Sequence, residues 1–419
     1  MSRFRALQHR NFQLFFFGQL ISLIGTWMQS TAQLWLVYKL TGSAALLGLF
    51  GFANQIAILL LASVGGYIGD RYNRHLGVIW TQTVSMILAF ILAVLALTGA
   101  IKVWQLILIA FLSGIVNAFD VPIRQAFLVQ MVGKPDLPNA IALNSSIFNA
   151  ARVVGPAIGG LTIAFFEARH VHSSEGWCFL LNGFSFVAVL VALLAMRLPK
   201  HEQKVPEGSP FRNFVEGYKF AMSDFPIRSA LLISSLMSLL GLQYAVFMPI
   251  FAKDILHSGA KGFGYLMSAA GVGATIGALQ FAARTNYKGL AKWIALMATI
   301  CSVGVIVFSQ SKMFWLSAIV LFTVGFAATS QLAATNTTVQ NRVPDALRSR
   351  VMAVYATMFM GVQPLGALLA GGLAKHFGAP LTLALFGTCC LIGSMVYFAY
   401  AVLKLPKTES VDAQVPLAQ

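Results

Sequence analysis

The stretch GYIGDRYNR, from Gly66 to Arg74, decides the architecture of this chain because it is a short charged loop between two long apolar runs. Residues 45–68 lead into the loop and residues 77–98 follow it, and both runs are almost entirely apolar. Each run has the roughly 20 apolar residues that an α-helix needs to cross a bilayer. We therefore interpret the loop as the connection between two transmembrane helices.

The composition of the whole chain indicates a membrane solvent as well. Of the 419 residues, 58% are hydrophobic and only 10% are charged, whereas soluble domains average about 25% charged residues. We predict an all-α polytopic membrane protein with two pseudo-symmetric six-helix halves. The twelve predicted transmembrane helices are 12–38, 45–68, 77–98, 103–123, 139–165, 177–196, 227–250, 262–283, 290–309, 312–333, 348–372 and 378–402.

Lysine and arginine are unequally distributed between the two sets of loops. With the N-terminus in the cytoplasm, the cytoplasmic segments hold 21 of the 29 basic residues, the outer segments hold 7, and Arg152 lies within the membrane. Short cytoplasmic loops carry such an excess of positive charge. The chain is thus predicted to be a multi-pass protein of a bacterial cytoplasmic (inner) membrane with both termini inside. The same bias explains most of the net charge of +16, so no nucleic-acid partner is implied.

The longest polar break separates the sixth and seventh predicted helices. It divides the chain into a six-helix half (1–196), a cytoplasmic linker (197–226), a second six-helix half (227–403) and a polar tail (404–419) that we expect to be disordered. In the linker, apolar side chains recur at helical spacing, which favours an amphipathic helix on the membrane surface over a plain solvated linker. These side chains are Phe211, Phe214, Val215, Tyr218 and Met222.

The two halves are related by a weak internal repeat. At a constant offset of 216, the second half carries the same residue as the first at several positions, while Asp70 falls on Asn286. Parallel repeats of this kind place a substrate site near the midplane, between the halves. The matching pairs are Gly25 with Gly241, Leu40 with Leu256, and Gly48 with Gly264.

The Gly66–Arg74 loop resembles the Gly-x-x-x-Asp-Arg-x-x-Arg signature of the major facilitator superfamily, and it lies at the matching place in the topology. In that family the motif locks the cytoplasmic side of the outward-open state, which implies gating roles for Gly66, Asp70, Arg71 and Arg74. The alternative is a basic loop that only sets topology. The second-half copy departs from the signature, since Asn286 replaces the aspartate.

Two further phrases, NAFDVPIRQAF around Asp120 and NAARVVGP around Arg152, extend the resemblance over nearly the whole chain. They are similar to the branch that contains the enterobactin exporter and related secretion-effector-type permeases. The lysophospholipid flippases of the superfamily are a neighbouring possibility. Many proton-coupled drug exporters of the superfamily have a buried acid in the first helix, and this chain has none there, so proton coupling is in doubt.

Asp120 is the only acid that falls well inside a predicted transmembrane helix. An intramembrane carboxylate is costly and is usually paired. Arg124 lies four residues further on, which places both on one helix face, and the resemblance adds the arginines of the loop motif as partners. A gate ion pair, a purely structural pair and a proton carrier are the three interpretations.

The fifth predicted helix carries Gly155-Pro156-Ala-Ile-Gly159-Gly160, which resembles the Gly-Pro-x-x-Gly-Gly motif of exporters in this superfamily. Glycine allows close helix approach and proline bends a helix, so Gly155 and Pro156 are predicted to form a pivot; helix packing alone is the alternative.

Arg152 falls near the middle of the same helix, where an unpaired cation is costly. We predict that Arg152 anchors an anionic group of the substrate; bonding to helix carbonyls is the alternative.

Polar side chains of the first helix recur at spacings of 3, 4, 3 and 4, from Gln19 through Ser22, Thr26 and Gln29 to Gln33. Such a stripe is kept away from lipid, and we expect it to face a wet central cavity, with interhelical hydrogen bonding as the alternative. The predicted substrate-binding residues are Gln19, Thr26, Gln29, Gln33, Asn149, Arg152, Gln243, Tyr244, Tyr355 and Gln363, and the predicted gating residues are Gly66, Asp70, Arg71, Arg74, Asp120, Arg124, Gly155 and Pro156.

These observations predict an alternating-access secondary transporter that exports an amphipathic small molecule, siderophore-like, lipid-like or drug-like. Its expected partners are that substrate, membrane lipids and, as a candidate coupling ion, protons, and we expect an antiporter that works as a monomer. The four cysteines lie in apolar segments without metal-ligand spacing, so no metal, cofactor or catalytic residue is expected. The alternatives are a lysophospholipid flippase of the same fold and a transport-inactive membrane receptor or scaffold; an enzyme is not expected.

Overall fold

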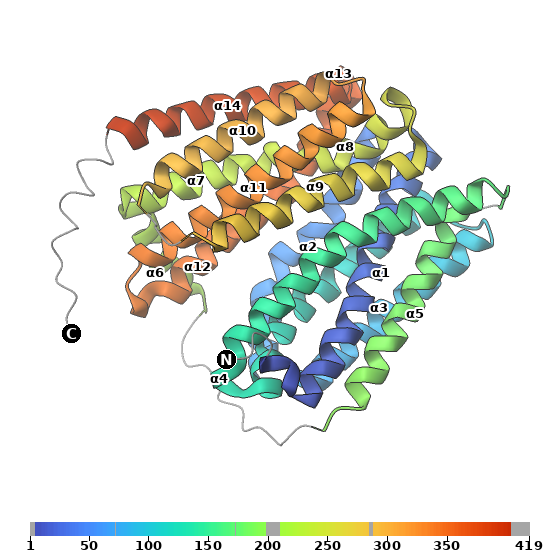
Figure 1. Ribbon diagram of the computed structural model, residues 1–419, viewed down its shortest axis with the longest axis horizontal. Coiled ribbons are helices and arrows are strands. Elements are labelled where there is room, and N and C mark those ends of the chain that lie inside the picture. Colours follow the sequence, from blue (N-terminus) through green and yellow to red (C-terminus); the bar gives the residue numbers. More distant parts are fainter. Residues whose placement is uncertain (1–4, 72, 172, 198–209, 285–287, 404–419) are drawn as a thin grey trace. The chain divides into compact units, whose positions relative to one another are not determined.

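The computed structural model describes residues 5–71, 73–171, 173–197, 210–284 and 288–403, and in these ranges the chain forms helices joined by short turns (Figure 1). The first half contains η1 (Arg5–Gln8), α1 (Arg10–Thr41), α2 (Ala44–Arg71), α3 (Arg74–Leu97), α4 (Val103–Glu167) and α5 (Ser174–Leu194). Then follow α6 (Pro210–Ser223), α7 (Phe225–Leu239), η2 (Gly241–Gln243), α8 (Tyr244–Ile250), η3 (Phe251–Ile255), α9 (Gly259–Ala282), α10 (Leu290–Gln310), α11 (Phe314–Arg342), α12 (Asp345–Met360), α13 (Gln363–Phe377) and α14 (Ala379–Leu403).

The described helices provide the twelve membrane crossings that the sequence predicts. Ten segments are long and apolar enough to cross a bilayer. One of them, α4, has 65 residues, or about 98 Å at a rise of 1.5 Å per residue, so it supplies two crossings. The 32 residues of α1 are also long enough, although its polar stripe lowers its mean hydropathy. The predicted all-α fold with two six-helix halves is confirmed.

The predicted loop between the fourth and fifth helices is wrong in its extent. The helix of residues 103–123 continues through the expected loop and breaks only at Gly133, whose φ of 71° and ψ of 175° are outside the helical region. A residue without a Cβ adopts such a φ without steric cost. Gly133 therefore separates the two membrane crossings of α4, close to Pro135 and Pro138.

Two helices of the second half are interrupted where the sequence predicted continuous ones. The predicted segment 227–250 is divided into α7, η2 and α8, and the break falls at Gly241. The predicted segment 348–372 is divided at residues 361–362 into α12 and α13. In contrast, α11 continues to Arg342, well beyond the predicted end at residue 333. Breaks within membrane helices are tolerated where neighbouring groups satisfy the freed backbone.

The local sequence explains several helix ends. Gly42 ends α1 with a positive φ of 59°, and its N–H donates to the Tyr38 carbonyl. Asn73 caps α3, because its side-chain oxygen accepts hydrogen bonds from the N–H groups of His75 and Leu76. Asp224 caps α7 through the N–H of Ile227. The Asn73 and Asp224 side chains satisfy backbone donors that have no partner inside the helix, and Gly42 satisfies a carbonyl acceptor at the end of α1.

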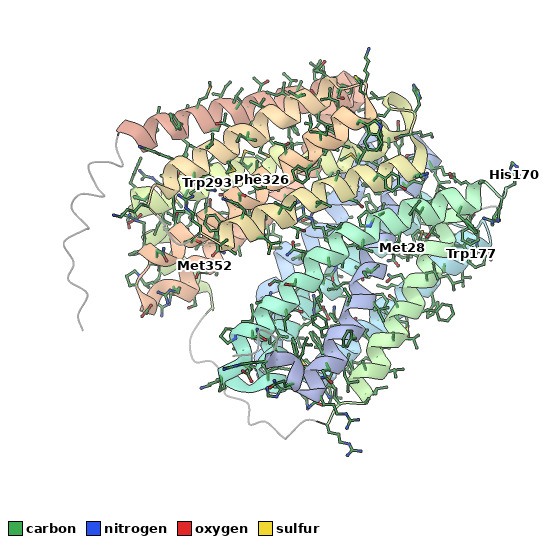
Figure 2. The ribbon with its side chains drawn as sticks, viewed as in Figure 1. Met28, His170, Trp177, Trp293, Phe326 and Met352 are labelled. Carbon is green, nitrogen blue, oxygen red and sulfur yellow. The ribbon has the colours of Figure 1, made fainter. Side chains whose placement is uncertain are left out.

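The described residues form two compact units that do not follow the two halves of the chain. The first unit contains α1 to α5 together with residues 246–271 and 367–375, which come from the second half. The described residues of the second unit lie within 210–245, 272–284, 288–366 and 376–403. Within the first unit, a turn that contains His170 connects α4 to α5 (Figure 2). On either side of this turn, the Trp177 ring of α5 stacks on the Phe166 ring of α4, with the ring centroids 4.6 Å apart.

The helix α6 occupies part of the predicted linker and packs onto the second unit. Phe214, Phe220 and Met222 contact a core that includes Ala221, Val339 and Val351. The Arg350 guanidinium also pairs with the Glu216 carboxylate. The apolar face of this helix is therefore covered by protein at these positions. The side chain of Phe211 lies outside the described part of the chain.

Candidate functional site

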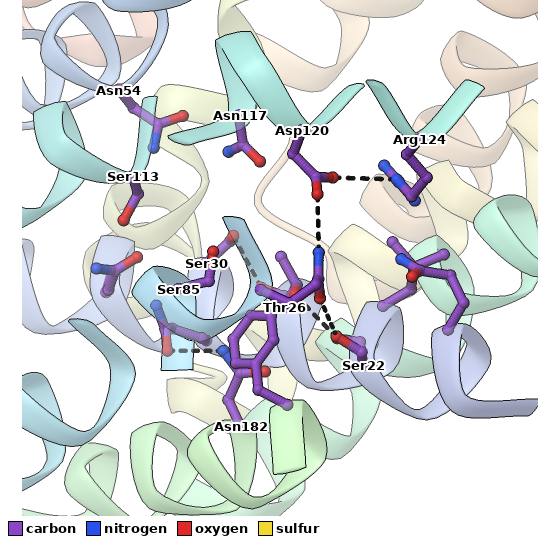
Figure 3. Close-up of a pocket in the computed structure, with 16 residues that line it drawn as sticks. Ser22, Thr26, Ser30, Asn54, Ser85, Ser113, Asn117, Asp120, Arg124 and Asn182 are labelled. Atoms are coloured by element: carbon purple, nitrogen blue, oxygen red, sulfur yellow. Dashed lines mark hydrogen bonds and ion pairs between the residues drawn. The ribbon is translucent and has the colours of Figure 1, made fainter. Parts of the chain in front are cut away.

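The polar stripe of α1 lines a cavity of about 120 Å³ inside the first unit (Figure 3). All five helices α1 to α5 contribute to its wall. The residues in the wall of this cavity all belong to the first half, and the expected role of the stripe in binding a substrate between the halves stays a prediction. The cavity has room for several water molecules. The stripe residues in its wall are Gln19, Ser22, Thr26, Gln29 and Gln33.

Hydrogen bonds across the cavity use only part of its polar groups. The Asn182 amide donates to the Gln29 carbonyl oxygen at 2.8 Å, and the Thr26 hydroxyl donates to the Ser22 backbone carbonyl at 2.8 Å. Gln19 and Gln33 are 2% and 4% exposed. Among the described residues, Gln19 Oε1 and Gln33 Nε2 have no hydrogen-bond partner. Because a buried polar group without a partner is costly, these two atoms mark the part of the stripe that the described protein leaves unsatisfied.

Asp120 lies at one end of this cavity and is 4% exposed. Its Oδ1 accepts hydrogen bonds from the Thr81 hydroxyl at 2.7 Å and from the Gln82 amide at 2.9 Å. Its Oδ2 lies 3.0 Å from Nε of Arg124, although this contact is not aligned for a hydrogen bond. The Ser22 hydroxyl extends the network to Gln82 Oε1 at 3.4 Å (Figure 3). The predicted Asp120–Arg124 pair is therefore present, and it is buried.

We expect Asp120→Asn to lower the thermal stability of the purified protein strongly. Removing one partner of a buried ion pair leaves the other charge uncompensated, which costs about 3–5 kcal/mol. Asp136→Asn is the matched control, since Asp136 pairs with His9 at 2.9 Å but its side chain is 23% exposed. Melting curves of both variants in one detergent make the comparison. If Asp120→Asn and Asp136→Asn have the same melting temperature, the buried Asp120 pair contributes no more to stability than the more exposed Asp136 pair.

The gating residues of the loop motif are only partly described. Arg74 donates from Nη1 to the Ala126 carbonyl at 3.1 Å, which attaches the start of α3 to α4. Arg71 ends α2 and is exposed. The side chains of residues 62–70, and with them Gly66 and Asp70, lie outside the described part of the chain. The gating role of this loop stays a prediction.

The Gly-Pro motif of α4 packs against two different helices. A Cβ on Gly155 would lie 2.5 Å from Trp27 Cβ and 2.8 Å from the Ile24 carbonyl oxygen of α1, next to Met28 (Figure 2). A Cβ on Gly160 would lie 2.5 Å from the Ala260 carbonyl oxygen of α9. Both contacts exclude any larger side chain without a shift. The glycines therefore have a packing function, while the pivot role of Gly155 and Pro156 stays a prediction.

Arg152 lies one turn before Pro156 and is half-buried. Its Cζ is 5.9 Å from the centroid of the Trp27 ring, a distance that allows a cation–π contact. Among the described residues, no carboxylate lies within ion-pair distance of its guanidinium. Asn149, one turn earlier, donates to the Ser145 backbone carbonyl at 2.9 Å. Arg152 thus matches the prediction of a cation without a dedicated partner.

Two of the second-half candidates, Gln243 and Tyr355, have polar side-chain groups that are already engaged. Gln243 is 1% exposed, and its amide donates to the backbone carbonyls of Ser238 at 3.0 Å and Gln363 at 3.3 Å. The Tyr355 hydroxyl donates to the Leu332 carbonyl at 3.4 Å. Tyr244 is 5% exposed. These contacts stabilise the interrupted helices of the second unit, and a role of these residues in substrate binding stays a prediction.

Charged and aromatic groups meet at the end of the first unit where α1 ends and α2 begins, which we call the far end. The Tyr38 hydroxyl donates to the Asp254 carboxylate, and Nζ of Lys253 lies 5.4 Å from the Tyr38 ring centroid. The next residue, Lys39, pairs with Glu175 at 2.9 Å. Tyr38 therefore connects α1 to a segment of the second half, within one compact unit.

Two glycine pairs lie close to this far end. A Cβ on Gly48 would lie 2.7 Å from Gly371 Cα, and a Cβ on Gly264 would lie 3.0 Å from Gly160 Cα. Gly48 and Gly264 are one of the pairs in the internal repeat at an offset of 216. At this position the repeat places a glycine in each half, and each of these two glycines packs against a glycine of the other half. We call these two contacts the glycine seams.

Sequence reasoning missed several functional groups. Thr81 and Gln82 escaped notice because polar residues in the third helix showed no periodic pattern. Glu175 was assigned to a loop, but it is 1% exposed at the start of α5, so Asp120 is not the only buried acid. Lys39 was assigned to the loop after the first predicted helix, so its pairing with Glu175 was not foreseen.

Two six-helix halves, a cavity with a polar lining and close glycine contacts between helices are features of a polytopic membrane transporter. The family model described as transmembrane secretion effector matches residues 1–418. The chain therefore belongs to this family of major facilitator transporters, and it is not an enzyme.

Three relatives illustrate the similarity of the chain to known transporters. It is 28% identical to the staphyloferrin A transporter of Staphylococcus aureus, covering 94% of this chain and 98% of that protein. It is 25% identical to the multidrug efflux pump Tap of Mycolicibacterium fortuitum, covering 95% and 96%. It is 24% identical to the enterobactin exporter EntS of Shigella boydii, covering 87% and 85%. None of these three is described as a lysophospholipid flippase.

Solved structures confirm the fold. A bacterial homologue of the human lysosomal transporter Spinster, in an inward-facing and unoccupied conformation, superposes with a TM-score of 0.72 at 14% identity, covering 95% of this chain and 98% of that chain. The nucleoside transporter NupG superposes with a TM-score of 0.70 at 14% identity, covering 93% of this chain and 98% of that chain. At these identities the likeness concerns the fold alone.

Proposed function

We propose that this protein is an alternating-access exporter of an anionic, amphipathic small molecule of the siderophore class. The observation that carries the proposal is Arg152, a half-buried cation in the middle of a membrane helix with no carboxylate in ion-pair distance among the described residues. A guanidinium binds carboxylate or phenolate groups through several N–H donors. Two of the three relatives named above are transporters of siderophores, which supports the same class.

A second candidate is polyspecific drug export, favoured by the similarity to a multidrug efflux pump. The two candidates differ in the charge of the substrate. A site with one uncompensated cation and, among the described residues, no carboxylate beside it disfavours the cationic compounds that many drug pumps export. An anionic substrate is therefore the stronger proposal.

Transport in proteoliposomes tests the proposal. Vesicles containing the purified protein should take up or release a catecholate siderophore faster than protein-free vesicles, and a hydrophobic cationic dye should not compete. Inhibition by the cationic dye together with no siderophore flux would favour drug export. Absence of flux for both probes, despite tight binding, would favour a receptor. An imposed pH gradient in the same vesicles measures proton coupling.

We also propose that the linker and both termini face the cytoplasm of a bacterial inner membrane, as the basic bias of the loops indicates. A single cysteine introduced into the linker should react with an impermeant maleimide only after the cells are permeabilised. Rapid reaction in intact cells would reverse the assigned orientation and with it the direction of transport.

A further inference from the structure

A groove of about 420 Å³ opens between α7 and α14 in the second unit. Its wall is apolar apart from the end near α6, and Leu232 and Val396 in this wall are 54% and 51% exposed. In a membrane-spanning chain, exposed apolar side chains of this kind face lipid. The groove is thus a hollow in the lipid-facing surface of the second unit.

The matching seam of the first half is closed. There, α1 packs directly against α5, because Gly18 allows Ala192 and Val189 to approach, and a Cβ on Gly18 would lie 3.0 Å and 3.1 Å from their nearest atoms. Between α7 and α14, close contacts occur at Gly393, whose Cβ would lie 2.2 Å from Leu236, and again where Tyr400 meets Phe225 at 5.7 Å. The groove between these contacts is a feature of the second half.

The groove has the length of one lipid leaflet. From Phe225 to Leu236, α7 advances eleven residues, or about 17 Å at 1.5 Å per residue. Half of the hydrocarbon core is about 15 Å thick. A single acyl chain that enters at the Phe225 end therefore reaches the midplane where the groove closes at Leu236.

The polar end of the groove carries an uncompensated cation. Arg228 lies in its wall, with Cζ 5.6 Å from the Phe225 ring centroid and Nη1 donating to the Met222 carbonyl at 3.2 Å. The nearby Asp224 is engaged elsewhere, because it caps α7 and lies 3.6 Å from Arg342. Among the described residues, no carboxylate pairs with Arg228.

We propose that this groove binds one anionic phospholipid, with an acyl chain along Leu232 and Leu236 and the phosphate on the Arg228 guanidinium. The phosphate of such a lipid matches the charge of Arg228, and its acyl chain matches the apolar wall and the length of the groove. Tyr400, which is 42% exposed at the same end, provides the amphipathic ring that is typical of the headgroup region.

Native mass spectrometry of the purified full-length protein with added phosphatidylglycerol or phosphatidylcholine tests the proposal. We expect one phosphatidylglycerol to be retained with at least about tenfold preference over phosphatidylcholine, because its phosphate lacks a compensating positive group. Arg228→Gln should abolish the preference, and Arg228→Lys should keep part of it. Leu232→Trp should fill the groove and release both lipids. Arg169→Gln, which removes an exposed arginine of the first unit, is the control.

Equal retention of both lipids by the unaltered protein would overturn the proposal, and so would an unchanged preference in Arg228→Gln. This comparison of lipids in the unaltered protein decides the matter even where a variant fails to fold. A concentration-dependent dimer that disappears in Leu232→Trp, without a lipid preference, would assign the groove to a second copy of the chain instead.

Discussion

Replacing Gly371 by valine should disable transport, whereas the same replacement at the neighbouring Gly372 should have little effect. A Cβ on Gly371 would lie 2.9 Å from Gly48 Cα and 2.9 Å from the Ala44 carbonyl oxygen, both on α2. A Cβ on Gly372 would meet nothing within 4 Å. Valine therefore forces α2 and α13 apart at one position only.

The expected effect on the glycine seam is large. Overpacking a close contact costs about 1–3 kcal/mol, which corresponds to a shift of about 5- to 150-fold in the population of the closed seam. An alternating transporter depends on both populations, so its turnover should fall by a similar factor. Gly264→Val in the other seam should act in the same direction, because its Cβ would lie 2.5 Å from the Pro156 carbonyl oxygen.

Spin labels measure this effect without knowledge of the substrate. Labels at Leu40→Cys and Lys375→Cys are both exposed and lie within the first unit. Their distance distribution should shift to longer values in Gly371→Val and should stay the same in Gly372→Val. If both variants have the same distance distribution and the same transport rate, close packing at the glycine seams is not required for transport.

Arg152→Gln should weaken the binding of an anionic substrate by about 10- to 100-fold. A hydrogen bond to a charged group contributes about 1.5–3 kcal/mol, and glutamine loses the charge as well as the planar donor fork. Arg152→Lys keeps the charge and should lose less affinity. Trp27→Leu removes the ring beneath the guanidinium and should have a smaller effect, since the ring contact is 5.9 Å.

The competing interpretation is that Arg152 only braces α4 within the bundle. Bracing predicts that Arg152→Gln and Arg152→Lys both lose thermal stability while the remaining folded protein binds substrate with normal affinity. Arg169→Gln is the matched control, because Arg169 also lies over an aromatic ring, with Cζ 3.5 Å from the Phe165 centroid, but is exposed. Melting temperature and dissociation constant, measured on the same samples, separate the two roles, and an unaltered dissociation constant would falsify the anchor.

Local sequence information was enough for the parts of the molecule that depend on one segment at a time. The number of helices follows from apolar length, because every crossing must satisfy its backbone hydrogen bonds internally. The Asp120–Arg124 pair follows from a spacing of four residues on one helix face.

The identity of the partners between helices came only from the tertiary structure. Every helix of a membrane protein is apolar over much of its circumference, so periodicity does not show which face meets which neighbour. Thr81 and Gln82 contact Asp120 because α3 packs on α4 at that height, and the buried Glu175 pairs with Lys39 in the last turn of α1. The α1 stripe is a further example, because the residues that line its cavity with it come from α2 to α5.

The sequence by itself thus determined the membrane class, the helix count, the signature loop and the Arg152 cation, since these depend on composition, length and local spacing. The tertiary structure decided the break at Gly133, the glycine seams and the groove between α7 and α14. The glycine seams and the groove depend on how closely two helices approach, and that distance is set by residues far apart in the chain, such as Gly48 and Gly371. Contacts of this kind have no signature in either segment alone.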